Sequence, residues 1–316
     1  MKVAILDNVH PIFEKMFLSW GWEVVSAQKW STKDFQKKIN NVNGIVIRSR
    51  ILLNQQNLSF AKNLKFIARP GSGLENIDLE YCKKHNIEVF RSPEGNRDAL
   101  AEHVMGMVLM LNNHLFRANT QVKEFIWNRE GNRGSELMGK TFALIGFGFM
   151  GEALAKRLSG FGVNIIAYDK YKKNFSSSYV KEVSLDELFE SADYVSLHTP
   201  LTNETIGLVN KEFISRFKKQ FILINSARGK SVVLKDLVDA LLVGKISGAC
   251  LDVLELESNS FENVDLSLNK SFETLKKMDN VILSPHIAGW SHESKFKMAD
   301  FLVKKISSKY KGISYL

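Results

Sequence analysis

The sequence predicts an α/β protein with two domains, each built on a parallel sheet. Short apolar segments alternate with polar, helix-compatible stretches in both halves of the chain, and this alternation is typical of parallel sheets. A long stretch with apolar residues at helical spacing begins at Asp98 and separates the two alternating halves. The length of 316 residues also suits two domains.

The individual elements follow from this pattern in chain order. In the first half we expect strands at residues 2–6, 23–26, 44–48, 64–68 and 87–90. A turn at 92–96 (SPEGN) should precede the long helix, which we interpret as a domain connector. In the second half we expect strands at 141–145, 163–168, 193–197, 221–225, 247–251 and 280–284. The polar segment 258–279 has no Gly or Pro and is expected to be an irregular or helical insertion.

Composition excludes several classes of protein. Two cysteines, Cys82 and Cys250, are too few for a disulfide-framed secreted module. The first apolar run is interrupted by Asp7 and is too short for a signal sequence or a membrane span, so we expect a cytoplasmic protein without a membrane partner. The net charge of +9 comes mainly from scattered lysine pairs. This pattern indicates solvated surface rather than a nucleic-acid-binding face, although a mild field favouring anionic ligands is an alternative.

A glycine-rich loop is the first sign of function. Residues 146–151 read G-F-G-F-M-G, after an apolar strand and before a helical pattern. In this context Gly146 permits a tight turn, Gly148 lets a diphosphate approach the backbone, and Gly151 allows close packing of helix on strand. Asp169 ends the next strand, where a carboxylate can bind the adenosine ribose and disfavour a 2′-phosphate. The loop therefore predicts a dinucleotide site that prefers NAD.

Three further residues have the chemistry that a hydroxy-acid oxidation needs. Arg228 follows an apolar strand in N-S-A-R-G, and its planar guanidinium suits a carboxylate. His286 follows another strand in S-P-H-I-A-G and can exchange a proton near neutral pH. Glu257 can pair with His286 only if the fold brings the two together. Structural roles for these residues remain the alternative at this point.

The chain resembles the D-isomer-specific 2-hydroxyacid dehydrogenases over nearly its whole length, and among them most resembles the short-form phosphoglycerate dehydrogenases. The resemblance rests on motifs that recur in order, namely V-I-R-S-R (46–50), R-P-G-S-G-L-E-N-I-D (69–78), G-F-G-F-M-G (146–151), S-L-H-T-P-L-T (196–202), I-N-S-A-R-G (224–229), A-C-L-D-V (249–253) and S-P-H-I-A-G (284–289).

The resemblance implies a role for each motif. The catalytic set is Arg228, Glu257 and His286. The implied NAD contacts are Gly146, Gly148, Phe149, Met150, Gly151, Asp169, Thr199, Pro200, Ser226, Ala227, Arg228, Asp252, His286 and Gly289. Among these, Phe149 and Met150 contact the diphosphate, and Asp252 contacts the nicotinamide carboxamide. The implied substrate contacts are Arg48, Ser49, Arg50, Ser72, Gly73, Arg228 and Trp290, with Arg48 and Arg50 facing a substrate phosphate. No metal site is implied.

The resemblance also implies a discontinuous architecture of two Rossmann-like or flavodoxin-like domains. Residues 1–98 and 290–316 form the substrate domain, and an NAD-binding domain (99–289) is inserted between them, with the active site in the cleft. A homodimer is expected, with residues 112–137 supplying an arm. Three features depart from the family pattern: Ser258 follows Glu257 where Pro is common, the connection from Glu257 to His286 is long, and Trp290 replaces a smaller residue. The chain ends at Leu316, so we expect no appended regulatory domain.

The leading hypothesis is NAD-dependent oxidation of 3-phospho-D-glycerate to 3-phosphohydroxypyruvate, the entry step to serine biosynthesis. A related alternative is a reductase of glyoxylate, hydroxypyruvate or another 2-keto acid. An alternative from a different class is an NAD-sensing binding protein. An intact Arg228, Glu257 and His286 argues against that last alternative.

Overall fold

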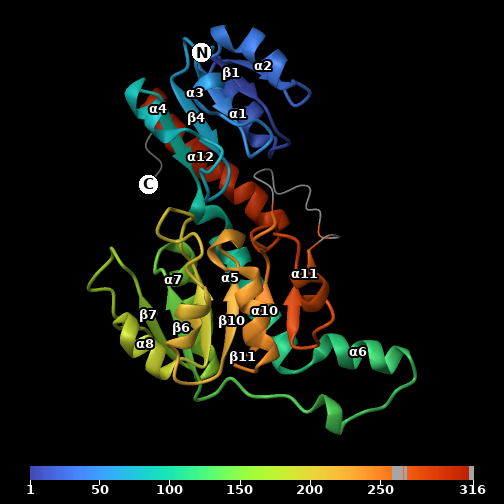
Figure 1. Cartoon of the computed structure of the whole chain (residues 1–316). Helices are drawn as coiled ribbons and strands as arrows, with labels where there is room; N and C mark the ends of the chain where they lie inside the picture. The colour runs from blue at the N-terminus through green and yellow to red at the C-terminus, as the bar shows by residue number, and fades with distance from the viewer. Residues whose placement is uncertain (258–265, 267–268, 313–316) are drawn as a thin grey trace. The chain divides into compact units, whose positions relative to one another are not determined.

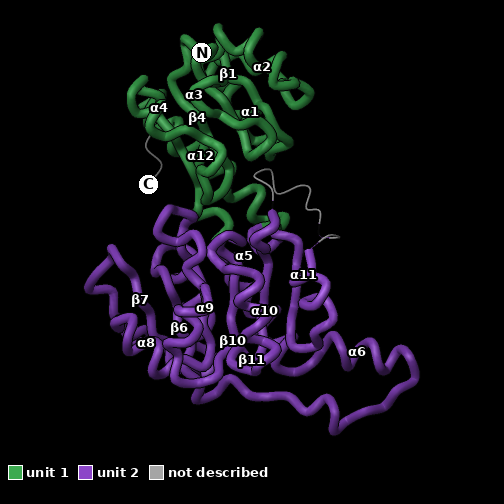
Figure 2. The backbone as a smooth tube through the Cα atoms, in the orientation of Figure 1, with its two compact units in different colours: residues 1–97, 259–261, 290–316 green, residues 98–258, 262–289 purple. Residues whose placement is uncertain are grey.

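The structure, a computed structural model, describes residues 1–257, 266 and 269–312 (Figure 1). The chain folds into two compact units (Figure 2). Unit 1 contains residues 1–97 and 290–312, and unit 2 contains the described residues from Asp98 to Gly289. The chain therefore leaves unit 1, completes unit 2 and returns to unit 1 for its last helix.

Unit 1 is built on a five-stranded parallel sheet with the order β2-β1-β3-β4-β5. This is the order of flavodoxin-like sheets. The strands are β1 (Lys2–Ile5), β2 (Glu23–Ser26), β3 (Gly44–Val46), β4 (Phe66–Arg69) and β5 (Glu88–Arg91).

Helices cover both faces of this sheet because successive side chains of its strands point to opposite sides. Ile45 and Ile67 face a core closed by α2 and α4, while Val46 and Phe66 face a core closed by α1 and α12. Ser31 and Ser291 begin α2 and α12 with capping boxes. The unit 1 helices are α1 (Ile12–Ser19), α2 (Thr32–Lys38), α3 (Gln55–Leu58), α4 (Leu79–Lys84) and α12 (His292–Lys311), with the 3₁₀ turn η1 (Ile39–Asn41).

Unit 2 is built on a seven-stranded parallel sheet with the order β12-β11-β10-β9-β6-β7-β8. The strand order reverses between β6 and β9, and such a switch point is where doubly wound sheets bind ligands. The strands are β6 (Thr141–Ile145), β7 (Asn164–Tyr168), β8 (Lys181–Glu182), β9 (Tyr194–Leu197), β10 (Phe221–Asn225), β11 (Ile246–Leu251) and β12 (Val281–Leu283).

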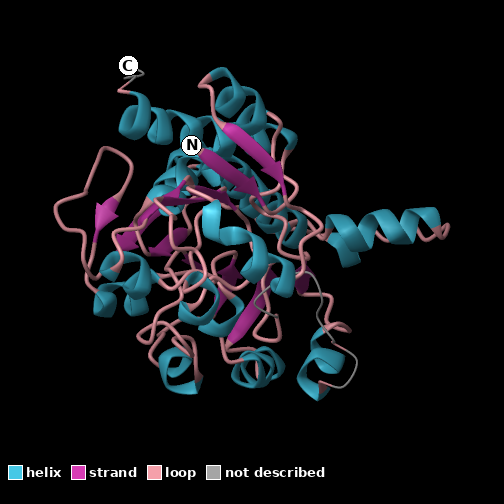
Figure 3. Ribbon diagram, turned by 90° about the horizontal axis from the view of Figure 1, so that it is seen from above, coloured by secondary structure: helices cyan, strands magenta, loops and turns pink. Residues whose placement is uncertain are grey.

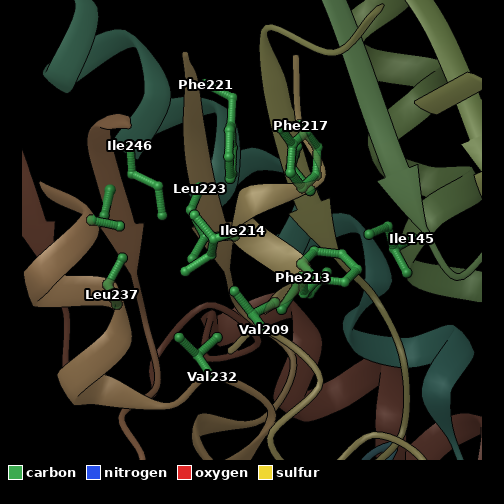
Figure 4. Packing of buried hydrophobic residues seen from close by; sticks show 14 of the residues in the cluster. Ile145, Val209, Phe213, Ile214, Phe217, Phe221, Leu223, Val232, Leu237 and Ile246 are labelled. Carbon is green, nitrogen blue, oxygen red and sulfur yellow. The ribbon is translucent and has the colours of Figure 1, made fainter. Parts of the chain in front are cut away.

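Two apolar cores hold the helices of unit 2 on its sheet. One core contains Phe213 of α9, Phe217 from the segment after α9 and Leu237 of α10, together with Phe221 and Leu223 of β10 (Figure 4). The other packs α5 and α7 on the opposite face. The helices are α5 (Pro93–Asn112), which begins in unit 1, α6 (Leu115–Lys123), α7 (Phe149–Leu158), α8 (Leu185–Ser191), α9 (Lys211–Ser215), α10 (Leu234–Leu242) and α11 (Lys270–Leu275), with 3₁₀ turns η2 (Glu130–Asn132), η3 (Ser159–Phe161) and η4 (Gly229–Ser231).

The predicted α/β class with two parallel sheets is confirmed, two local predictions need correction, and one strand is not predicted by the sequence pattern. The expected turn at 92–96 belongs to a helix, because α5 begins at Pro93, a residue suited to the first helical turn. The long helical stretch breaks at His114, which has φ of 51°. The two-residue strand β8 has too little pattern to be recognised. Of the predicted insertion at 258–279, residues 258–265, 267–268 lie outside the described residues, and α11 forms within the remainder.

Helix α6 and the segment that follows it extend away from the sheet of unit 2 (Figures 1 and 3). No residue of α6 is buried. The residues around it include exposed large apolar side chains, namely Phe116, Phe125, Ile126 and Trp127. We refer to residues 112–137 as the arm.

Candidate active site

The carboxyl ends of three neighbouring strands bring the predicted catalytic residues to one edge of unit 2. Strand β10 pairs with β11, and β11 pairs with β12, all in parallel. Arg228 follows β10, Glu257 follows β11, and His286 follows β12. Ligands of open parallel sheets bind at this edge. The sheet order therefore explains how residues far apart in sequence share one region.

His286 and Glu257 form a hydrogen-bonded pair, which the sequence could not establish. The Nδ1 atom of His286 lies 2.9 Å from Oε2 of Glu257. The other carboxylate oxygen of Glu257 accepts a hydrogen bond from the Leu254 N–H at 2.7 Å, which fixes the carboxylate in place. A carboxylate accepts the Nδ1 proton, so Nε2 of a neutral His286 is the atom that can take a proton from a ligand.

A second histidine in unit 2, His198, differs from His286 in its environment. It is partly buried, and desolvation by burial lowers its pKa to about 4. Its Nε2 atom lies 2.9 Å from Oγ of Ser196. His198 is therefore neutral near pH 7 and is not suited to exchange protons there.

The turn that carries Arg228 is held by the buried Asn225. Its side-chain oxygen accepts from the Ala227 N–H at 3.1 Å, and its amide donates to the Arg228 carbonyl at 2.9 Å. Gly229 is required next, because a Cβ there would lie 1.8 Å from the carbonyl oxygen of Leu254. This close approach brings the loop after β10 against the loop leading to Glu257. Sequence reasoning missed Asn225, although a buried Asn at a strand end was a usable signal.

Asp252, predicted to contact a nicotinamide carboxamide, is buried at the end of β11 and binds the loop of His286. Its side chain accepts from the Ile287 N–H at 2.9 Å and the Ala288 N–H at 2.8 Å. Its main-chain carbonyl accepts from the His286 N–H at 2.7 Å. Gly289 ends this loop and is the last residue of unit 2.

The glycine-rich loop forms the predicted strand–turn–helix between β6 and α7. Gly146 has φ of 94°, and a Cβ there would lie 2.8 Å from the main chain of His198, so only glycine fits. Nothing lies within 4 Å of a Cβ built on Gly148, which leaves space above its backbone. Phe149, Met150 and Gly151 form the first turn of α7. The N–H groups of such a turn are suited to bind a diphosphate.

Asp169 is fixed beside the glycine loop at the end of β7. Its side chain accepts from the N–H groups of Phe147, Tyr171 and Lys172 at 2.8–2.9 Å. Burial alone would raise the pKa of Asp169, but these N–H groups and the Lys172 ammonium hold that pKa below its ordinary value. The carboxylate is thus charged and oriented, as recognition of a ribose diol requires.

Two buried hydroxyls lie where the resemblance implies further cofactor contacts. Thr199 and Pro200 follow β9, and Ser226 and Ala227 follow β10. Within the part of the chain that the structure describes, the Thr199 Oγ1 and Ser226 Oγ atoms are buried without a hydrogen-bond partner. Such groups are costly unless a ligand satisfies them. With the open space at Gly148 and the charged Asp169, these hydroxyls fit a bound dinucleotide.

In unit 1 three of the predicted substrate residues, Arg48, Ser49 and Arg50, follow β3. The Asp7 carboxylate accepts hydrogen bonds from the N–H groups of Arg48 and Ser49 at 2.5 and 3.2 Å. The Arg50 guanidinium donates to the carbonyls of Leu6, Ala27 and Trp30. These hydrogen bonds, together with the Arg50 Nε atom 3.4 Å from Oδ1 of Asp7, brace the loop, and the phosphate contact of Arg50 stays a prediction.

Arg48 and Arg69 reach the same edge of the unit 1 sheet. Strand β3 pairs with β4 in parallel, with Val46 opposite Ala68, so both arginines lie at the carboxyl ends of neighbouring strands. Sequence reasoning missed Arg69, although it opens the motif that contains Ser72 and Gly73. Ser72 Oγ donates to the Asn96 side chain at 3.1 Å.

Trp290 packs against the predicted anion-binding loop of unit 1. The Arg48 guanidinium carbon lies 4.1 Å from the centroid of the Trp290 ring, a cation–π contact. The Trp290 side chain is nevertheless 63% exposed. The ring therefore contacts Arg48 while most of its surface remains exposed to solvent.

Comparisons with known proteins agree with this geometry. Residues 105–288 match the family described as "D-isomer specific 2-hydroxyacid dehydrogenase, NAD binding domain". A hydroxypyruvate reductase from Thermotoga maritima is 36% identical, with 89% of each chain covered. The chain belongs to the D-isomer-specific 2-hydroxyacid dehydrogenases. Members of this family are NAD-dependent oxidoreductases, and the predictions of family, enzyme class and cofactor are confirmed.

Other relatives in the family differ in their substrates. A D-3-phosphoglycerate dehydrogenase from Archaeoglobus fulgidus is 34% identical over 99% of this chain, and one from Bacillus subtilis is 34% identical over 97%. This chain spans 58% and 55% of their lengths. The solved D-lactate dehydrogenase of Aquifex aeolicus, with NAD and lactic acid, is 30% identical with a TM-score of 0.84, covering 99% of this chain and 96% of that one.

The fixed Asp169 leads to a prediction about cofactor choice. Lys170 donates to Glu204 at 2.7 Å, so this nearby ammonium is engaged by a carboxylate. Changing Asp169→Ser together with Glu204→Gln should raise the NADPH:NADH ratio of kcat/KM by about tenfold or more, because a repulsive charge is lost and Lys170 is released. Glu204→Gln alone is the control and should change the ratio little. An unchanged ratio in the double variant would contradict the role of Asp169.

Within the described residues, no helix combines the length and apolar character needed to cross a membrane.

Proposed function

We propose that this protein oxidises and reduces the C2 position of a small D-2-hydroxy acid with NAD, using His286 as the acid/base. The observation that carries this proposal is the His286–Glu257 hydrogen bond of 2.9 Å, next to the Arg228 turn at the same sheet edge. When bound, the cofactor supplies the hydride acceptor for oxidation and the hydride donor for reduction.

The protein residues handle the proton and the charge. During oxidation, Nε2 of His286 takes the proton of the substrate's 2-hydroxyl, while the C2 hydrogen leaves with its electron pair and the carbonyl forms. During reduction, His286 returns that proton to the carbonyl oxygen. Glu257 stabilises the protonated ring and fixes its orientation. Arg228 binds the carboxylate and polarises the reacting oxygen, for which its planar N–H groups are suited.

The substrate that we favour is 3-phospho-D-glycerate, oxidised to 3-phosphohydroxypyruvate in serine biosynthesis. Unit 1 supports this choice because Arg48 and Arg69 lie at the ends of adjacent strands, and Asp7 fixes the backbone of the Arg48 loop. Two guanidinium groups at one edge suit an anionic group remote from the reacting carbon. The similarity to phosphoglycerate dehydrogenases points in the same direction.

A second candidate is the reduction of hydroxypyruvate or glyoxylate. It is favoured by the similarity to the Thermotoga maritima reductase, which extends over 89% of both chains. The contact between the Trp290 ring and Arg48 also favours this candidate. An aromatic ring packed against the guanidinium leaves fewer directions from which a phosphate could approach it.

Removing the Arg48 side chain distinguishes the two candidates. For Arg48→Ala we expect kcat/KM with 3-phosphohydroxypyruvate to fall by roughly 10–100-fold, the effect of losing charge-assisted hydrogen bonds. With hydroxypyruvate the loss should be less than about threefold. Lys62→Ala, at an exposed cation of the same unit, serves as the control. Equal losses with both keto acids would contradict a phosphate-binding role for Arg48.

We also propose that the arm mediates assembly into a homodimer. Its side chains Phe125 and Trp127 are 99% and 79% exposed, and clustered exposed aromatic residues are typical of protein interfaces. Light scattering should give a mass twice the 35.9 kDa of one chain. Phe125→Asp with Trp127→Asp should yield monomers, whereas Val243→Asp, at an exposed apolar residue outside the arm, should not. A monomeric wild-type protein would contradict this proposal.

A further inference from the structure

A hydrogen-bond network in unit 2 connects helix α5 with the loop that carries His286. Ser284 Oγ donates to Oδ1 of Asp252 at 2.6 Å. The same Ser284 oxygen lies 2.9 Å from Nε2 of His103 on α5. His103 Nε2 itself lies 3.5 Å from Asp252 Oδ1. None of the roles described above requires His103 or Ser284.

The chemistry of the serine hydroxyl fixes the direction of these hydrogen bonds. Ser284 has one hydroxyl proton, and the short contact with the Asp252 carboxylate uses it. The Ser284 oxygen must then accept from His103, so His103 carries a proton on Nε2. Another acceptor is near, because Met107 Sδ lies 3.6 Å from Ser284 Oγ. The His103 N–H therefore favours the orientation in which the Ser284 hydroxyl donates to the Asp252 carboxylate.

Asp252 in turn determines the backbone around His286. His286 has φ of 56°, a conformation that a non-glycine residue adopts only when its surroundings impose it. The His286 N–H donates to the Asp252 carbonyl, and the next two N–H groups, from Ile287 and Ala288, donate to its carboxylate. The Asp252 side chain is only 1% exposed, so water cannot readily replace a lost donor.

We propose that His103 is a positioning residue for His286, acting through Ser284 and Asp252. Without its N–H, the Ser284 hydroxyl is free to turn toward Met107, a weaker acceptor, and the buried Asp252 carboxylate loses a donor. The loop from Ser284 to Gly289 then holds His286 less firmly. The effect on turnover rests on the proposed dehydrogenase function, whereas the effect on the loop does not.

Steady-state kinetics test the effect on turnover. His103→Leu is expected to lower kcat about tenfold, while KM for the keto acid and the dissociation constant for NADH change less than twofold. His103→Gln, which retains an N–H donor, should recover most of the lost kcat. When Ser284→Ala is already present, adding His103→Leu should lower kcat by less than about a further twofold. The hydrogen bond through which His103 acts is already absent in that background. Fully additive losses, or no recovery with glutamine, would overturn the proposal.

Amide hydrogen exchange tests the same network without relying on activity. His103→Leu should speed exchange in the peptide containing residues 284–289, relative to wild type. The control is Glu102→Gln, at the neighbouring residue on α5, which pairs with Arg157 instead. That variant should leave both exchange and kcat unchanged. Unaltered exchange at 284–289 in His103→Leu would overturn the positioning role, even if the wild-type enzyme turned over none of the keto acids tried.

Discussion

Replacing His286 with glutamine is expected to lower kcat for reduction of 2-keto acids by roughly 10²–10⁴-fold, the usual contribution of a general acid. Glutamine has similar reach but cannot exchange a proton near neutral pH. The Asp252 contacts that hold this loop go to main-chain N–H groups and therefore remain available in the variant. The dissociation constant for NADH, measured by fluorescence titration, should change less than about threefold.

The matched control is Glu257→Gln, which leaves His286 in place but replaces its charged partner. Because the partner only orients and stabilises the ring, we expect a smaller loss of kcat than in His286→Gln. His85→Gln, at an exposed histidine of unit 1, should have no effect. A His286→Gln variant that retained full kcat, or lost NADH binding instead of turnover, would show that His286 is not the acid/base.

Replacing Arg228 with glutamine is expected to lower kcat/KM for 2-keto acids by roughly 10²–10³-fold. A guanidinium that binds the carboxylate and polarises the reacting oxygen stabilises the developing charge, and loss of one such donor costs about 3–4 kcal/mol. The Arg228 carbonyl, which accepts from Asn225, is retained in the variant. The loss should appear in steady-state kinetics with NADH saturating.

Arg228→Lys separates charge from shape at this position. Lysine keeps the positive charge but lacks the planar pair of N–H donors, so it should recover less than about a tenth of the lost kcat/KM. Circular dichroism should show that both variants remain folded. Wild-type activity in Arg228→Gln would contradict the carboxylate-binding role, whereas wild-type activity in Arg228→Lys alone would show that a positive charge suffices at this position.

Much of the fold follows from the sequence because parallel strands buried on both faces are nearly continuous apolar runs. Strands such as β6 and β10 begin and end at the predicted residues. The glycine loop is equally predictable from the sequence. Gly146 has a φ of 94° and lies close to the main chain of His198, so only glycine can occupy this position. The start of α5 is not evident from the sequence, because Pro93 and Gly95 look like turn residues but occupy the first turn of a helix.

The arrangement of the site is harder to predict because it depends on contacts between distant segments. The 2.9 Å contact of His286 with Glu257 requires both loops to fold, and neither local sequence shows it. Arg50 illustrates a structural role that its motif does not reveal. As one of two arginines in V-I-R-S-R it suggests an anion site, but the carbonyls of Leu6, Ala27 and Trp30 occupy its N–H groups. Residues of one type in one motif can therefore differ in role.

The central claim is that this chain is an NAD-dependent enzyme that acts on 2-hydroxy acids. We further propose that the arginines of unit 1 make it prefer substrates that carry a second anionic group. Initial rates of NADH oxidation with 3-phosphohydroxypyruvate, hydroxypyruvate, glyoxylate and pyruvate test it most directly. We predict turnover that falls by roughly 10²–10⁴-fold in His286→Gln, with the highest kcat/KM for 3-phosphohydroxypyruvate. Absence of turnover with every keto acid, despite tight binding of NADH, would contradict the claim and indicate a protein that only binds the dinucleotide.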